Sequence, residues 1–164
     1  MSDYVGKKFE QKFMSDWLKT EGAYIYRLKD IMSGYRKVSN ISDFVGYLYP
    51  YMYLIELKST KGNTFNFAKL TQYDQLKTAR NVPGLNVGVI IWFYEKDKVC
   101  YVPIEECVRL KEKLAKKSIH IQMIDNSDYE VYEIPSEKKR KYMDSNYSIM
   151  KNIADIKYNK LYNR

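Results

Sequence analysis

The chain has 164 residues, 45% of them hydrophobic, and 28 Lys or Arg against 20 Asp or Glu. This length supports one domain with a sizeable core, and the net charge of +8 favours a polyanionic partner such as nucleic acid. A single histidine, His120, excludes histidine-rich zinc sites and argues against a serine triad, so any metal would be held by carboxylates, which suits magnesium or manganese.

The first half of the chain is predicted to form a helix at 5–21, a strand at 23–28, a polar basic segment, and strands at 41–48 and 52–58. The helix is indicated by Phe9, Phe13 and Trp17, which recur every four residues and therefore share one face. Tyr49-Pro50 is the expected turn between the last two strands. No long apolar run predicts a membrane span, and the start has no apolar core of a secretion signal.

The second half is predicted to form a helix at 70–81, a strand at 86–95, its hairpin partner at 98–103, a helix at 104–117, edge strands within 119–134 and a helical tail at 137–164. The order predicts an α/β fold, a single domain over 1–136 with one mixed central sheet flanked by helices. The tail, 137–164, carries eight Lys or Arg against three acids and is expected to be a basic extension. It could grip DNA, form a dimer contact or be a solvated face.

Two cysteines, Cys100 and Cys107, form neither a CxxC pair nor a zinc pattern, so reduced thiols in a cytoplasm are expected. No glycine-rich phosphate loop occurs, and the sequence gives no support for a nucleotide cofactor.

The predicted hairpin brings two acids together. A turn centred between Tyr49 and Pro50 opposes residues whose numbers add to 99, so Asp43 faces Glu56 with Cβ atoms about 5 Å apart. Lys58 follows on the same face because strand side chains alternate. Opposed carboxylates repel unless a proton or a cation lies between them, and a divalent cation with a lysine beside it suits phosphodiester hydrolysis without histidine.

Around this pair the sequence resembles the RecU-type Holliday-junction resolvases of the PD-(D/E)XK nuclease superfamily. The matching positions are Gly6, Phe9 and Glu10 on the first helix, Asp43, Phe44 and Gly46 before the turn, Glu56 and Lys58 after it, Thr64 and Phe65, and Gln75 on the next helix. The resemblance as a whole runs thinly from Gly6 to about Pro103, and the tail has no motif of the family.

The resemblance implies a restriction-endonuclease-like fold and a magnesium-dependent, structure-selective endonuclease, with Mn²⁺ as a possible substitute. Such an enzyme resolves Holliday junctions by paired nicks, acting as a homodimer on branched DNA in a bacterial or phage-infected cell. By the same resemblance, Asp43, Glu56 and the backbone carbonyl of Leu57 bind the metal, and Glu10 completes its shell. Lys58 orients or activates water, and Gln75 positions the site or the phosphate.

One departure concerns the family's junction-probing stalk, which precedes the catalytic aspartate. Only residues 23–42 fill this interval here, a compact version that would suit a phage or mobile element and that weakens the prediction of junction specificity. Basic side chains expected to contact nucleic acid are Lys7, Lys8, Arg27, Lys29, Arg36, Lys37 and Lys61. A smaller departure is Leu57, which stands where the family usually has alanine.

Three alternatives compete with a resolvase. The chain could be another PD-(D/E)XK nuclease that cuts flaps or duplex, or a non-catalytic DNA-binding accessory protein of recombination. It could also be a basic domain whose acidic hairpin is only a surface salt-bridge ladder. The presence of Glu10, Asp43, Glu56 and Lys58 together favours a nuclease, because a binding module gains nothing from opposed acids.

Overall fold

The computed structural model describes residues 2–33 and 36–162, with the backbone alone at 2–3, 31–33 and 36–38. Its first elements are α1 (Ser2–Trp17), β1 (Tyr24–Arg27), β2 (Ile31–Ser33), β3 (Arg36–Val38), β4 (Phe44–Leu48), β5 (Tyr51–Thr60), β6 (Thr64–Asn66) and the 3-10 turn η1 (Phe67–Lys69). The remaining elements are α2 (Tyr73–Thr78), β7 (Leu85–Phe93), β8 (Lys98–Pro103), α3 (Ile104–Val108), the π turn η2 (Arg109–Lys113), β9 (Ser118–His120), the 3-10 turn η3 (Ile121–Met123), β10 (Tyr132–Glu133), β11 (Ser136–Lys138), β12 (Met143–Ser145) and α4 (Ile149–Tyr162).

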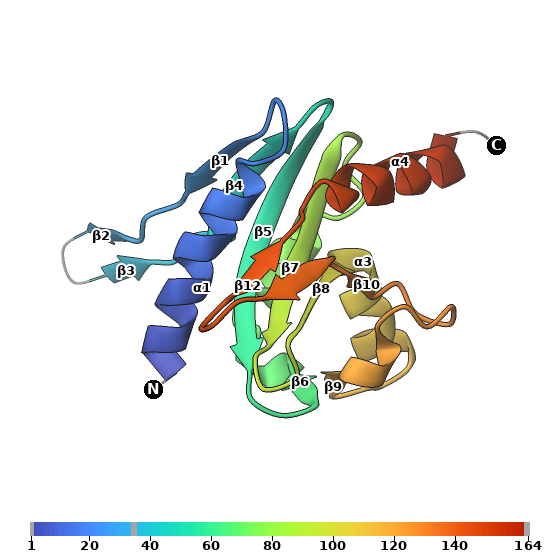
Figure 1. Cartoon of the computed structure of the whole chain (residues 1–164). Helices are drawn as coiled ribbons and strands as arrows, with labels where there is room; N and C mark the ends of the chain where they lie inside the picture. Colours follow the sequence, from blue (N-terminus) through green and yellow to red (C-terminus); the bar gives the residue numbers. More distant parts are fainter. Residues whose placement is uncertain (1, 34–35, 163–164) are drawn as a thin grey trace.

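A mixed sheet of six strands forms the centre of the molecule, in the order β1-β4-β5-β7-β8-β10 (Figure 1). The β5–β7 pair is parallel and the other pairs of this sheet are antiparallel. The predicted α/β architecture, a mixed central sheet flanked by helices, is confirmed.

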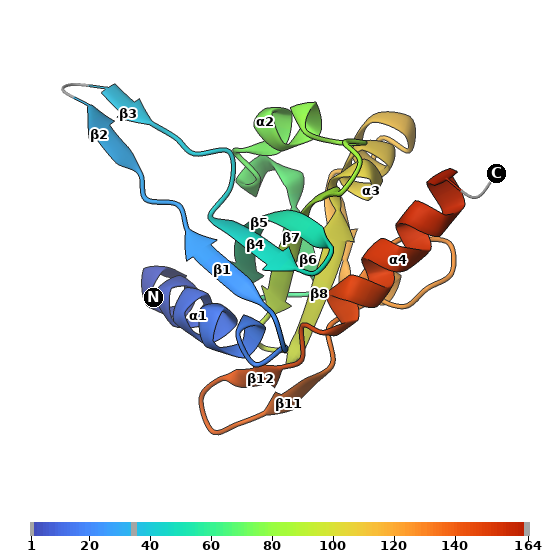
Figure 2. The ribbon, with the colours of Figure 1, turned by 90° about the horizontal axis from the view of Figure 1, so that it is seen from above.

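Helices cover both faces of the sheet, α1 and α4 on one side and α2 and α3 on the other (Figure 2). On the first side, Phe13 and Trp17 of α1 are fully buried against Phe44 and Tyr53 of the sheet. The predicted apolar face of the first helix is therefore confirmed. On the second side a separate cluster joins α2, α3 and alternate residues of β5, β7 and β8.

Strand β7 lies in the middle of the molecule, and eight of its nine residues are buried. Its continuous apolar sequence serves both clusters, with Ile90 and Trp92 on the α1 side and Val89 and Ile91 on the α2 side. A strand that is buried on both faces needs apolar side chains at consecutive positions, which explains the absence of alternation here.

The chain after residue 136 differs from the predicted helical tail. Ser136–Ser145 forms the β11–β12 hairpin, and helix begins only at Ile149. Residues of this segment are buried in the cluster under α1, namely Met143, Tyr147, Met150, Ile153 and Ala154. The apolar positions are spaced among many lysines, which is why composition alone suggested a surface extension.

Two predicted helices are shorter in the structure. The helix expected at 70–81 is limited to Tyr73–Thr78, and the one expected at 104–117 ends its α-helical part at Val108 and continues as a π turn. Leu70, before α2, and Leu110, after α3, lie outside the α-helical parts but are buried in the second cluster. Their apolar character therefore reflects tertiary packing and not a longer α-helix. Among the described residues no helix has the length and apolarity needed to cross a membrane.

Candidate active site

The β4–β5 hairpin has the register predicted from the Tyr49-Pro50 turn. Phe44 pairs with Ile55 and Leu48 with Tyr51, so opposed residue numbers add to 99, and the Tyr49–Pro50 peptide bond is cis. Asp43 immediately precedes β4 and therefore faces Glu56 of β5. Both acids lie on the sheet face away from α1, because their neighbours Phe44 and Ile55 point into the cluster under that helix.

Glu56 is buried in an unusual way for a carboxylate. Its side chain is 1% exposed, and its Oε2 has no hydrogen-bond partner among the described residues. Its ionic contact is with Lys58, whose Nζ lies 2.8 Å from Oε1. Asp43 is better satisfied, since its Oδ2 accepts a hydrogen bond of 2.9 Å from the Leu57 N–H.

The surroundings of the two acids favour their protonated forms. Burial raises the pKa of Glu56 to about 7, with a further contribution from the charge of Asp43, and Lys58 opposes both effects. Burial also raises the pKa of Asp43, while the Leu57 hydrogen bond and Lys58 oppose this. Two carboxyls that are buried and face each other need a shared positive charge to ionise together.

This donor set fits a hard divalent cation. Glu56 Oε2, which is buried without a hydrogen bond among the described residues, is available as a ligand, and oxygen ligands are those that magnesium and manganese prefer. In the part of the chain that the structure describes, no group of three or more His, Cys, Asp or Glu side chains is arranged to hold a metal. A metal would therefore rely on Asp43, Glu56 and non-carboxylate ligands such as a main-chain carbonyl or water.

Glu10 lies near the acid pair but has a partner of its own. Its Oε2 accepts a hydrogen bond of 2.8 Å from Nε of Arg27 on β1. Its charge still acts on Asp43, contributing to the raised pKa of that side chain. The structure thus brings Glu10 into the electrostatic surroundings of the acids, although its direct contact is with Arg27.

A small cavity of about 40 Å³ adjoins Asp43. It is lined by Arg27, Leu28, Asp30, Asn40, Ser42, Asp43 and Gln72. The Asn40 Nδ2 atom is buried without a hydrogen-bond partner among the described residues, so this cavity presents a donor as well as the Arg27 guanidinium. Donors beside an acid pair are suited to the oxygens of a phosphate group.

The glutamine in this cavity is Gln72, not the Gln75 that the sequence indicated. Gln72 directly precedes α2, and its Oε1 accepts a hydrogen bond of 2.8 Å from the Thr71 hydroxyl. Gln75 is exposed on α2 and does not line the cavity. Gln75 was indicated by the resemblance to the family motif, and Gln72 has no counterpart among the motif positions.

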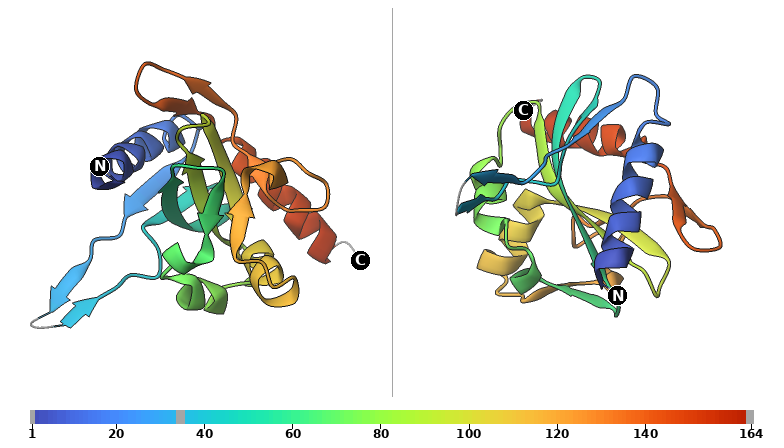
Figure 3. Two further views of the ribbon diagram at one scale, coloured as in Figure 1. Left: turned by 90° about the horizontal axis from the view of Figure 1, so that it is seen from below. Right: turned by 90° about the vertical axis from the view of Figure 1, so that its left-hand side faces the viewer.

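The predicted DNA-contact residues are distributed around this site. Four of them are exposed, namely Lys7, Arg27, Lys29 and Lys61. The Nζ of Lys61 lies 3.8 Å from Oε1 of Glu95. Lys8 is half-buried, and its Nζ lies 4.3 Å from the ring centre of Tyr4. Arg36 and Lys37 belong to β3, but their side chains lie outside the described residues. The β2–β3 hairpin, which corresponds to the stalk-like segment, projects away from the sheet on the α2 side (Figures 2 and 3).

Comparison with known proteins gives a family for this arrangement. Residues 10–154 match the RecU family, described as recombination protein U. The chain belongs to the RecU family. It is therefore a Holliday-junction resolvase, an endonuclease of DNA recombination that binds branched DNA, and resolvases of the RecU family are metal-dependent nucleases.

One solved structure with some likeness is Hjc of Archaeoglobus fulgidus, a Holliday junction resolvase from an archaeal hyperthermophile. It has 17% sequence identity and a TM-score of 0.47, and the match covers 79% of this chain and 87% of that chain. With so low a TM-score, the RecU assignment rests on the family match. A search of curated protein sequences gives no match.

Proposed function

We propose that this RecU protein is a magnesium-dependent homodimeric endonuclease whose catalytic pair is Asp43 and Glu56. The observation that carries the proposal is the buried Glu56 carboxylate, which faces Asp43, has Lys58 Nζ at 2.8 Å from Oε1 and leaves Oε2 without a hydrogen bond among the described residues. A carboxylate in this state costs stability unless it serves a cation, and a structural ion pair does not require a second acid opposite it.

Each residue of the site has a role that follows from its position. Asp43 and Glu56, with the carbonyl of Leu57, would hold the ion, which supplies a lowered pKa for water and stabilises charge on the phosphate. The Leu57 N–H fixes the orientation of Asp43. Lys58, 22% exposed, reaches from Glu56 toward solvent and can orient the attacking water or a phosphoryl oxygen.

Arg27 and Glu10 form the second part of the site. The side chain of Arg27 is 46% exposed, so its guanidinium can bind a phosphate oxygen while its Nε stays with Glu10. Glu10 would then position Arg27 and contribute to the metal shell through water. Gln75 would position the site or the phosphate, as the resemblance implies, and Gln72, which lines the cavity beside Asp43, would add a second amide there.

A homodimer is proposed because a four-way junction is resolved by two opposed nicks, and each chain supplies one such acid pair. Mg²⁺, with Mn²⁺ as a substitute, is proposed because the ligands are oxygens. A cytoplasmic location in a bacterial or phage-infected cell is supported by Cys100 and Cys107, which are both free and buried.

The test is cleavage of a synthetic four-way junction with and without Mg²⁺ by wild type, Asp43→Asn and Glu56→Gln. We expect each variant to lose more than about 100-fold in cleavage rate while still binding the junction, because the loss falls on the chemical step. Asp74→Asn is the matched control, since it removes a carboxylate that is exposed on α2. It should cut like wild type.

Three outcomes would change the conclusion. Equal cutting by wild type and both variants would show that the acids are not catalytic. Cutting of flaps or linear duplex as fast as the junction would identify a less selective nuclease of the same superfamily. Junction binding by wild type with no cutting in Mg²⁺ or Mn²⁺ would identify a DNA-binding accessory protein.

A further inference from the structure

The turn of the β11–β12 hairpin is the most concentrated positive charge of the chain. Residues 138–141 are Lys, Lys, Arg and Lys in succession. Lys138 forms an ion pair with Asp97, and Lys139 lies 3.0 Å from Glu137. Arg140 and Lys141 are both at the end of the hairpin, and both are exposed. The site described above uses none of these four side chains.

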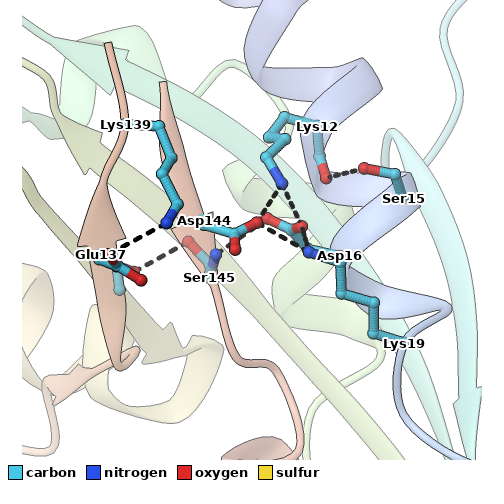
Figure 4. Close-up of polar contacts among 9 residues, drawn as sticks. Lys12, Ser15, Asp16, Lys19, Glu137, Lys139, Asp144 and Ser145 are labelled. Atoms are coloured by element: carbon cyan, nitrogen blue, oxygen red, sulfur yellow. Dashed lines mark hydrogen bonds and ion pairs between the residues drawn. The ribbon is translucent and has the colours of Figure 1, made fainter. Parts of the chain in front are cut away.

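The hairpin is held firmly on α1 (Figure 4). Asp144 of β12 binds both Lys12 and Lys19 of α1, with a distance of 2.7 Å to Lys19 Nζ. Asp16, which is 2% exposed, binds the same two lysines and accepts a hydrogen bond of 2.9 Å from the Ser145 N–H. A buried charge that is satisfied in this way fixes the backbone of β12 relative to α1.

Further contacts make the turn itself a defined structure. Ser136 pairs with Ser145 and Lys138 with Met143 in the ladder, and the Lys139 N–H donates a 2.8 Å hydrogen bond to the Tyr142 carbonyl. Met143 is buried in the core under α1. The basic side chains therefore start from a fixed frame, which lowers the entropy that ordering them on a ligand would cost.

The position of the turn relates it to the candidate active site. Its charge reaches the first half of α1, because the pKa of Tyr4 is lowered mainly by Lys8 and also by Lys141. Glu10 lies about 9 Å farther along the same helix. The β2–β3 hairpin and the β11–β12 hairpin project on opposite sides of α1 (Figures 2 and 3). The two hairpins thus flank the helix that carries Glu10.

We propose that Arg140 and Lys141 contact the phosphate backbone of one arm of the DNA, on the α1 side of the site. This inference rests on the proposed function and adds a contact surface to it. The neighbouring positive side chains repel each other, and the negative phosphates of DNA offset that repulsion. Binding also releases counterions from the DNA, which favours the contact. The contact carries no sequence information, because phosphates are common to all sequences.

The experiment compares wild type with Arg140→Ala/Lys141→Ala in binding to a labelled four-way junction in EDTA over a range of salt concentrations. We expect weaker binding and a slope of log affinity against log salt that is shallower by about 2, roughly one for each phosphate that the variant no longer neutralises. Arg140→Lys/Lys141→Arg keeps both charges and should keep the wild-type slope. Circular dichroism and thermal unfolding check that the variants remain folded.

The matched control is Lys151→Ala/Lys160→Ala, which removes the same charge from exposed positions of α4. Its slope should equal that of wild type. An unchanged slope for the hairpin variant, or an equal change of slope in the α4 control, would overturn the inference and leave the proposed function intact. Failure of the wild type itself to bind and cut the junction would overturn the proposed function as well.

Discussion

Glu56 combines properties that a merely structural residue would not keep. Its side chain is almost fully buried, its Oε1 is paired with Lys58 while Oε2 has no hydrogen bond among the described residues, and a second carboxyl lies opposite. Buried charge is usually satisfied by several donors, as Asp16 is by two lysines and a main-chain N–H. The contrast between two buried acids of the same chain indicates that Glu56 is kept available for a ligand.

In the metal-free protein, ionisation of the buried Glu56 carboxyl should lower the free energy of unfolding in a pH-dependent way. The folded-state pKa of Glu56 is raised from 4.5 to about 7, so the folded chain binds more protons than the unfolded chain between these values. The free energy of unfolding therefore falls as pH rises through this window, by about 3 kcal/mol. Glu56→Gln should raise Tm at pH 8 in EDTA, and the gain should shrink toward pH 5.

Thermal unfolding of both proteins in EDTA at pH 5, 6.5 and 8 measures this effect. A Tm difference that does not change with pH would contradict the assignment of the cost to Glu56 ionisation. Repeating the pH 8 measurement with Mg²⁺ adds a second readout. Wild type should gain Tm because a ligand that binds only the folded state stabilises it, and the variant should gain less.

Among the elements, the contact between α1 and the β4 strand explains one residue of the family motif. An added Cβ at Gly46 would lie 2.9 Å from Cζ2 of Trp17 and 3.2 Å from Cδ1 of Ile25. Trp17 cannot withdraw easily, because it is fully buried and its Nε1 donates a 2.9 Å hydrogen bond to the Tyr24 carbonyl. The glycine lets the helix lie close to the strand that follows Asp43.

We therefore expect Gly46→Ala to lower the free energy of unfolding by about 1–3 kcal/mol, the usual cost of overpacking. Gly62→Ala is the control, because nothing lies within 4 Å of an added Cβ there. Urea unfolding of both variants gives the two changes on one scale. Equal stability of the Gly46 and Gly62 variants would mean that the α1–β4 spacing is adjustable.

Elements also show what the sequence could predict. The β4–β5 register was predictable because the Tyr49-Pro50 turn and strict alternation leave one pairing that buries Phe44 and Ile55 together. The start of α2 could not be predicted, because Leu70 lies outside the helix and is buried by tertiary packing. Gln72, the residue before α2, lines the cavity beside Asp43, and single-sequence periodicity contains no signal for that position.

At the scale of the whole molecule, the C-terminal segment is part of the core rather than an appendage. Tyr147 is 1% exposed and packs edge-on against Phe13, with ring centres 4.9 Å apart. Met150 is fully buried, and its carbonyl accepts a 3.0 Å hydrogen bond from the Tyr53 hydroxyl. The sequence could not show this, because the partners of these residues are about a hundred positions away in the chain.

The division into a nuclease domain at 1–136 and an extension at 137–164 can be tested directly by truncation. We expect a chain ending at Ser136 to lack cooperative unfolding, although it keeps Glu10, Asp43, Glu56 and Lys58. Removing Met143, Tyr147, Met150 and Ile153 would expose Phe13, Trp17 and Tyr53, at a cost of several kcal/mol for each large side chain removed.

A chain ending at Asn159 is the matched control, since it removes Lys160, Leu161 and Tyr162, which are all exposed, and keeps the buried part of α4. Circular dichroism during heating should show a sharp transition for this control and none for the shorter chain. A sharp transition in the chain ending at Ser136 would show that the sheet and α1 fold alone. The basic hairpin would then be a separable DNA-binding segment. The ion pairs of Asp16 and Asp144 with Lys12 and Lys19 would then orient the hairpin on α1 without being needed for folding.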